Sequence, residues 1–163
     1  MAVDMFMQIE GIPGESTDEA HAEWMELLSY SHGLSQPVSG SSGTGGRTGG
    51  RADFQDFTVV KTIDCGSPDL AIYCASGKHI PSIVIELCLA TEDKHTFMKF
   101  EMSDVIVSSV SQDGSSDMSE VRPTEVVTFA YGKLVWEYTP VDQTGAAGAA
   151  STRTWNLETN KQE

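Results

Sequence analysis

Basic residues are scarce in this chain of 163 residues. Ten lysines and arginines stand against 24 aspartates and glutamates, which gives a formal net charge of −14. The field of such a surface repels the phosphate backbone of nucleic acids, and no run of basic residues is present to overcome it. We therefore expect a well-solvated surface and no nucleic-acid partner. A rim that selects basic partners is the alternative explanation of the charge.

Cysteines are also few, and long apolar runs are missing. Cys65, Cys74 and Cys88 form no CxxC pair, and their odd number does not suit a disulfide framework. Buried thiols in a reducing cytosol explain them most simply. No stretch approaches the ~20 apolar residues of a membrane helix, so no membrane insertion is expected. Residues 1–6 lack the basic flank and apolar core of a Sec signal peptide.

Motifs for nucleotide, metal or cofactor binding are missing as well. Gly77 and Lys78 resemble the end of a P-loop, but Ile72 replaces its first glycine and His79 its Ser/Thr. The glycine-rich run has no GxGxxG register, and the four histidines have no HxxH or HxxxH spacing. We predict no metal and no cofactor.

Catalytic motifs are equally hard to find. There is no G-x-S-x-G nucleophile elbow. Cys74 and His79 could form a nucleophile and base, but Cys74 falls on the apolar face of a predicted helix, which favours a buried, inert thiol. The sequence therefore predicts no catalytic residue and no enzyme activity.

Alternation of apolar and polar residues runs through most of the chain and predicts eight or nine short strands. Gly132 interrupts the last long strand and indicates a bulge or a bend, and Pro140 ends that strand. This pattern is typical of a β-barrel or a sandwich. The predicted strands cover residues 3–9, 25–34, 54–63, 83–89, 96–102, 105–110, 125–138 and 153–157.

One short helix is predicted, at about residues 68–76. Pro68 suits the first helical position, Ser67 is a good N-cap, and Gly77 suits the left-handed residue just past the end. One face carries Leu70, Tyr73 and Cys74.

A glycine-rich run, residues 39–50, contains six glycines. It cannot bury enough apolar surface to offset its ordering entropy, so it is predicted to be a flexible loop unless a partner orders it. Residues 145–151 form a second loose segment. At this length the default is a single domain, residues 1–163.

Several segments occur in an order that resembles one known family. They are AVDMFMQI at 2–9, GES at 14–16, HA at 21–22, GLSQ at 33–36, ASGKHIP at 75–81, VSSVS at 107–111, VVTFAY at 126–131 and WNLETNK at 155–161. Together with the glycine-rich run, this set resembles the haemolysin co-regulated protein (Hcp) family, the tube protein of type VI secretion systems. The resemblance spans nearly the whole chain.

The resemblance implies a mainly β fold, a β-barrel of two antiparallel sheets with one short α-helix. It also implies a homo-hexamer whose rings stack into a tube with a wide lumen. The implied partners are a contractile sheath, a VgrG-like spike protein and small effector proteins in the lumen. Such a protein is cytoplasmic before firing and then secreted, outside the cell or into a target cell, without a Sec signal peptide.

Two other functions remain open on the sequence. One is a monomeric β-barrel that binds a small apolar ligand, and the other is a small hydrolase with an unrecognised serine or cysteine site. For the tube, the apolar second face of strand 83–89, with Val84 and Cys88, offers surface to bury against a neighbouring subunit.

Alternation also suggests which residues serve a tube. Ser29 and Ser31 lie opposite Leu28, Tyr30 and His32, so they are candidates for the cargo-facing lumen if the apolar set faces the core. Otherwise these serines face solvent or a neighbour. The glycine-rich run is the candidate for ring-on-ring stacking, with an idle loop as the alternative. The candidate residues, in the run and directly after it, are Gly43, Gly45, Gly46, Arg47, Gly49 and Arg51.

Overall fold

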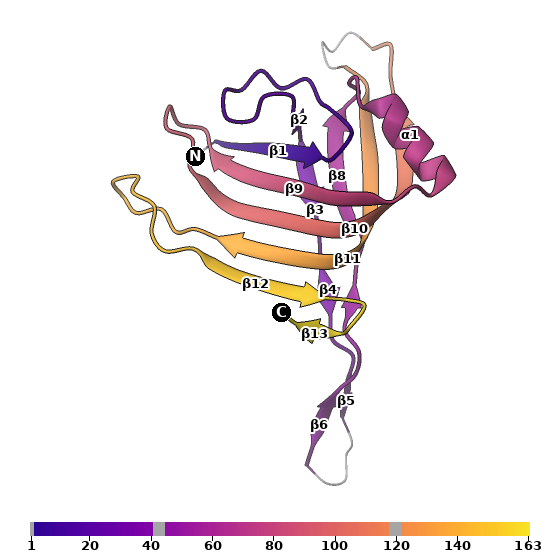
Figure 1. The fold of residues 1–163 in the computed structure, drawn as a ribbon, viewed down its shortest axis with the longest axis vertical. Coiled ribbons are helices and arrows are strands. Elements are labelled where there is room, and N and C mark those ends of the chain that lie inside the picture. Colours follow the sequence, from indigo (N-terminus) through magenta and orange to yellow (C-terminus); the bar gives the residue numbers. More distant parts are fainter. Residues whose placement is uncertain (1, 41–44, 118–121) are drawn as a thin grey trace.

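Antiparallel strands make up most of the computed structural model, which describes residues 2–40, 45–117 and 122–163 (Figure 1). The predicted mainly β fold with one α-helix is confirmed within these residues. The elements are β1 Val3–Ile9, β2 Met25–Glu26, β3 Ser29–Ser31, β4 Leu34–Ser35, β5 Val38–Gly40, β6 Arg47–Gly49, β7 Asp53–Phe54, β8 Phe57–Thr62, α1 Ser67–Ser76, β9 Ile80–Leu89, β10 Thr96–Asp113, β11 Thr124–Tyr138, β12 Ser151–Asn156 and β13 Lys161–Gln162.

The two predicted sheets are two parts of one folded sheet of nine strands. The first part of β11 pairs with β8, from Thr124 opposite Thr62 to Phe129 opposite Phe57. Its second part, from Lys133 onward, pairs with β12. β10 accompanies β11 over nearly all of this length. The two long strands therefore pass from one face of the molecule to the other, as Figure 1 shows.

The barrel closes through the short segment that holds β2 and β3. The Leu27 N–H donates to the Met5 oxygen of β1 at 2.9 Å, and the next N–H, of Leu28, donates to the Val60 oxygen of β8 at 2.8 Å. The segment thus bonds to β1 on one side and β8 on the other. With β1 paired to β9, β9 to β10, β10 to β11 and β11 to β8, a closed ring of strands results.

Apolar side chains fill the inside of this ring. Alternation in β8 places Phe57 and Val59 inward with no exposed surface, and Phe129 and Val127 of β11 face them. Burial of each such side chain stabilises the fold by about 1.5–3 kcal/mol. The barrel is therefore a packed core with no room for a ligand at these positions.

Gly132 marks a bend and not a bulge. β11 exchanges one neighbour strand for another at this residue, while the register shift lies in β10, between Val107 and Ser109. Gly132 lies opposite Asp104, whose backbone is left-handed with φ of 51°. A Cβ at Gly132 would lie 3.2 Å from the Asp104 Oδ2, so glycine leaves room for this carboxylate.

The helix is where it was predicted, but its N-terminal cap is not. The N-cap residue is Gly66, without a side-chain cap, and Ser67 is already helical. The Ser67 hydroxyl instead donates to the Glu125 Oε1 at 2.6 Å, which ties the helix to β11. Gly77, with φ of 66°, ends the helix as predicted. No helix in the described ranges has the length and apolar character needed to cross a bilayer.

Residues 39–50, predicted to be a flexible loop unless a partner orders it, contain paired strands at both ends of the run. β5 and β6 pair there, from Val38 opposite Gly49 to Gly40 opposite Arg47, and the Ser39 and Thr48 hydroxyls lie 2.9 Å apart. Backbone pairing supplies the order that apolar burial cannot. We call residues 38–40 and 45–49 the hairpin arm; it extends away from the barrel at the bottom of Figure 1.

The second segment predicted to be loose, residues 145–151, is ordered where it begins. The Asp142 carboxylate accepts hydrogen bonds from the N–H groups of Thr144 and Ala146 at 2.8 and 2.9 Å. Gly145 takes a positive φ of 83° in this turn, and β12 starts at Ser151.

Candidate functional site

One outer face of the barrel is rich in small hydroxyl side chains. Cross-strand partners share a face of a sheet. Ser31 pairs with Thr58, Thr58 with Thr128, and Thr128 with Ser109, which makes a row across β3, β8, β11 and β10. We call this row and its neighbours the hydroxyl wall, made of Ser29, Ser31, Thr58, Thr128, Ser109 and Ser111.

Ser29 and Ser31 are both exposed and lie on this outer face, opposite the core side of their strand. The inward-facing set is only partly as predicted. Tyr30 and His32 stack on Phe57 at centroid distances of 5.8 and 5.3 Å, but Tyr30 is still 37% exposed and Leu28 is 53% exposed. Leu28 lies between β2 and β3, where the chain changes strand partners, and strict alternation fails there.

Hydrogen bonds within the wall hold its hydroxyls together. Ser108, the extra residue of the β10 bulge, donates to the Asp56 Oδ2 at 2.7 Å and lies 2.6 Å from the Thr128 Oγ1. The Ser109 hydroxyl contacts the same Thr128 oxygen at 2.5 Å. The wall presents short, mostly neutral hydrogen-bonding groups, which suits weak contact with many surfaces.

Only two residues of this wall were predicted from the sequence. Thr58, Ser109, Ser111 and Thr128 were missed, although each lies in a strand with clear alternation. Alternation indicates which residues share a face within one strand. The register between β3, β8, β11 and β10 is what brings the hydroxyls side by side, and it involves residues far apart in the chain.

The predicted stacking residues that the structure describes lie along the hairpin arm and at its base. Among the described residues, no atom lies within 4 Å of a Cβ placed at Gly45 or Gly46, so there is space around these two glycines. Arg47 is exposed on β6. Gly49 is close to Gln36 at the base of the arm. Gly43 lies outside the described residues.

Arg51 differs from Arg47 in being engaged with its own chain. Its guanidinium donates to the Leu157 oxygen at 3.2 Å, beside the C-terminal turn. Arg47, exposed on β6, is therefore the better placed of the two to contact another molecule. The two arginines, which the sequence analysis treated alike, have different surroundings.

The second face of β9 is covered by the chain itself at Cys88, whereas Val84 on the same face is only half-buried. His21, in the segment between β1 and β2, lies over β9, where its Nε2 is 2.6 Å from the Glu86 Oε2. Cys88 beneath it has no exposed surface. The expectation that Cys88 faces a neighbouring subunit was wrong, because its contacts are made within the chain. Buried thiols were predicted throughout, yet Cys65 is exposed and Cys74 half-buried.

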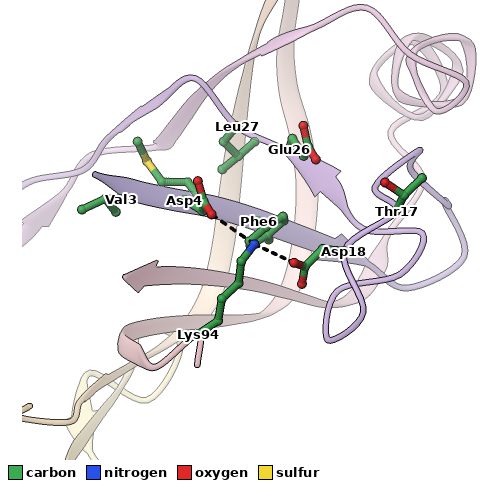
Figure 2. Close-up of a pocket in the computed structure, with 9 residues that line it drawn as sticks. Val3, Asp4, Phe6, Thr17, Asp18, Glu26, Leu27 and Lys94 are labelled. Carbon is green, nitrogen blue, oxygen red and sulfur yellow. Dashed lines mark hydrogen bonds and ion pairs between the residues drawn. The ribbon is translucent and has the colours of Figure 1, made fainter. Parts of the chain in front are cut away.

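A polar pocket of about 320 Å³ opens beside this segment (Figure 2). In it the Lys94 ammonium bridges two carboxylates, at 2.6 Å from the Asp18 Oδ2 and 3.1 Å from the Asp4 Oδ2. Hydrogen bonds from Lys94 and then from His21 lower the pKa of Asp18 to about 2. Lys94 is the one basic side chain that lines the pocket, against the three carboxylates of Asp4, Asp18 and Glu26, so acidic groups predominate there.

Aromatic rings gather at the opposite end of the barrel. His32 Nε2 lies 2.6 Å from the Tyr131 hydroxyl, which itself donates to the Gln55 oxygen at 3.0 Å. His32 must therefore donate through Nε2–H, and burial lowers the pKa of this imidazole. Next to it, an open apolar groove of about 370 Å³ is lined by Leu34, Phe54, Trp136 and Trp155.

A small closed barrel with a filled core, a hydroxyl wall and a projecting arm defines a β-barrel protein that works through its surfaces. The chain matches the family model described as type VI secretion system effector, Hcp, over residues 6–138. It is 38% identical to the protein hcp1 of Pseudomonas aeruginosa over 164 residues, which cover 99% of each chain.

Solved structures agree with this match. A type six secretion system protein superposes with a TM-score of 0.94 at 36% identity, over 99% of this chain and 100% of the other. Hcp1 from Salmonella typhimurium gives 0.82 at 32% identity, over 100% of both chains. The chain belongs to the Hcp family. It is a tube and effector protein of type VI secretion. The matches favour this function over the alternative of a monomeric barrel that binds an apolar ligand.

Proposed function

We propose that six copies of the chain form a ring and that rings stack into a tube with the hydroxyl wall facing the lumen. The wall is the observation that carries this proposal. One continuous row of small hydroxyls crosses four strands, and in the next row Ser29 and Ser111 flank Val60 and Val126. This face offers hydrogen bonds without a deep pocket. A carrier that must release its load needs contacts of this weak and unselective kind.

The cargo is a small effector protein, which lies in the lumen against Ser29, Ser31 and their neighbours. The tube carries a VgrG-like spike protein at its tip and lies inside a contractile sheath. The chain is cytoplasmic before firing and is then secreted, outside the cell or into a target cell, without a Sec signal peptide. Membership of the Hcp family supports each of these roles.

The hairpin arm makes the contact between stacked rings. Its strands are exposed along their whole length, and a feature that projects from a barrel can reach a second ring. Arg47 supplies positive charge to a protein whose net charge is −14. Arg47 forms ion pairs with carboxylates of the next, acidic ring, and added salt weakens these ion pairs by screening.

The role is structural and not catalytic. The Cys88 thiol is fully buried, and burial, its largest influence, raises the pKa of this thiol away from the reactive thiolate. The hydroxyls of the wall bond to one another and to Asp56, not to a histidine, among the contacts of the described residues. Neither place has an activated nucleophile.

Electron microscopy of the purified protein, together with its mass in solution, tests the proposal. Rings with a mass of about six subunits of 17.6 kDa are expected. A monodisperse monomer across ordinary salt concentrations contradicts the ring, and rings that never stack contradict the tube.

A further inference from the structure

Three side chains with metal-binding atoms meet under the segment between β1 and β2. They are His21 of that segment and Glu86 and Cys88 of β9, and their ligand atoms all lie within 4.8 Å of one another. The His21 Nε2 lies 2.6 Å from the Glu86 Oε2 and 3.9 Å from the Cys88 Sγ. We propose that these three residues form a binding site for a zinc-class transition-metal ion.

The ligand types favour zinc over harder cations. Imidazole nitrogen, thiolate sulfur and carboxylate oxygen are the three donors that Zn²⁺ accepts, whereas Mg²⁺ and Ca²⁺ select oxygen alone. Bonds of about 2.0–2.3 Å place neighbouring ligands of a tetrahedral zinc ion roughly 3–4 Å apart. The His21–Cys88 separation of 3.9 Å matches this spacing, whereas the His21–Glu86 separation of 2.6 Å is shorter. The Glu86 carboxylate must therefore move away from His21 by roughly 1 Å to accommodate the ion. Water fills the fourth position.

The imidazole is already oriented as in a metal site. Its other nitrogen, Nδ1, lies 2.9 Å from the Asp18 Oδ1, which directs Nε2 at the cluster. Zinc-binding histidines are usually held in this way by a carboxylate. Phe6 stacks on the ring at 4.2 Å and Trp24 meets it edge-on at 4.7 Å, so the ring is fixed on both sides.

The charge of the three ligands and the route from solvent also suit a bound Zn²⁺ ion. One hydrogen bond, of 2.6 Å, joins His21 and Glu86 and holds one proton, and Cys88 is a free thiol that holds another. Zn²⁺ displaces both protons, and its two positive charges balance the Glu86 carboxylate and the Cys88 thiolate. The Glu86 side chain is 18% exposed, which gives the ion an entry from solvent.

A metal here joins the segment between β1 and β2 to strand β9. The same segment forms one wall of the pocket in Figure 2, through Asp18 and Thr17. Bound metal is therefore expected to stabilise the folded barrel and to hold this surface in place. The inference depends on residues of this chain and not on assembly into a tube.

The test uses Co²⁺ as a spectroscopic probe in full-length protein in which Cys65→Ser and Cys74→Ser remove the other two thiols. After treatment with chelator, we expect one Co²⁺ per chain and an absorption band from thiolate-to-cobalt charge transfer. Zn²⁺ should displace the cobalt and raise the melting temperature. Cys88→Ser on the same background should abolish the band and the rise in melting temperature.

Two further variants separate ligands from their support. Glu86→Gln keeps the size of the side chain and should strongly weaken binding. Asp18→Asn should weaken it by about 10–100-fold and leave the charge-transfer band in place at saturation. Absence of cobalt binding in excess metal, binding without the band, or a band that survives Cys88→Ser would each overturn the site.

Discussion

Lys61 and Glu125 form an ion pair in which neither side chain has any exposed surface. Lys61 points inward from β8 and Glu125 from β11, next to the start of α1. The Ser67 hydroxyl and the Gln112 amide also donate to the Glu125 carboxylate, at 2.6 and 3.0 Å. A buried charge is tolerated only when it is paired and hydrogen-bonded in this way.

Removal of one partner of this pair should destabilise the barrel strongly. Glu125→Ala leaves the buried Lys61 ammonium with Asp64, whose Oδ1 lies 2.9 Å away, as its remaining carboxylate partner. We therefore expect the free energy of unfolding to fall by about 3 kcal/mol in urea titrations, the lower end of the range for a broken buried pair. The exposed pair of Lys133 and Glu163 is the control, and Lys133→Ala should cost about 1 kcal/mol or less. Equal losses in the two variants would contradict the distinction.

Acid should weaken the fold through the same carboxylate. Burial alone raises the pKa of Glu125, but hydrogen bonds from Lys61, Ser67 and Gln112 outweigh it and lower that pKa below 4.5. A carboxylate with a lowered folded-state pKa stabilises the fold above its unfolded value, and this contribution is lost as pH falls through the folded value.

Urea titrations of wild type and Glu125→Gln between neutral and acidic pH test this dependence. The free energy of unfolding of wild type should fall more steeply below pH 4.5 than that of the variant. Parallel pH profiles would show that Glu125 does not contribute to acid sensitivity.

Replacement of Ser31 by Gln should impair cargo without breaking the ring. The longer side chain covers neighbouring hydroxyls of the wall, and each lost hydrogen bond costs about 0.5–1.5 kcal/mol. Because every subunit carries the change, the amount of co-expressed effector retained should fall by roughly tenfold or more.

The matched control is Ser151→Gln, an exposed serine on β12 away from the wall. It should keep both ring and cargo. If every tested effector is retained and secreted as in wild type when Ser31 is changed, Ser31 is not a cargo contact.

Deletion of residues 43–49 should leave rings intact and lower tube formation and secretion. The deletion removes β6, so β5 loses its partner strand, while the strands of the barrel keep all their residues. Sedimentation and electron microscopy measure stacking. Unchanged tube assembly would refute a role for the arm.

Arg47→Glu gives a sharper version of the same test. Reversal of this charge should reduce stacking most at low salt, where screening is weakest. Arg153→Glu, on β12, is the control for a change of net charge alone, and it should have the smaller effect. Equal effects of the two variants would point to general repulsion between acidic rings.

Local patterns in the chain were enough to predict much of the fold. Strand β1 was predicted at the residues where it lies, and helix α1 within one residue of its start. These elements depend on the spacing of apolar residues and on Pro68 and Gly77, which act on their immediate neighbours. The exposed positions of Ser29 and Ser31 follow from the same alternation.

Contacts between distant residues could not be predicted in this way. Ser67 looks like a helix cap, but Glu125, 58 residues away, takes its hydrogen bond. The sequence predicted that Cys88 faces a neighbouring subunit, but His21, 67 residues away in the chain, covers it. The hydroxyl wall likewise needs the register of four strands.

The chain alone specifies helix α1, several of the strands and the side chains that share a face within one strand, because these depend on periods of 2 and 3.6 residues. The β5–β6 pair was not predicted from this pattern. Strand pairing and the closing of the barrel at Leu27 and Leu28 decide what those faces meet. Register is selected by the packing of the whole core at once, so the wall, the buried pair of Lys61 and Glu125, and the cluster around His21 exist only in the folded barrel.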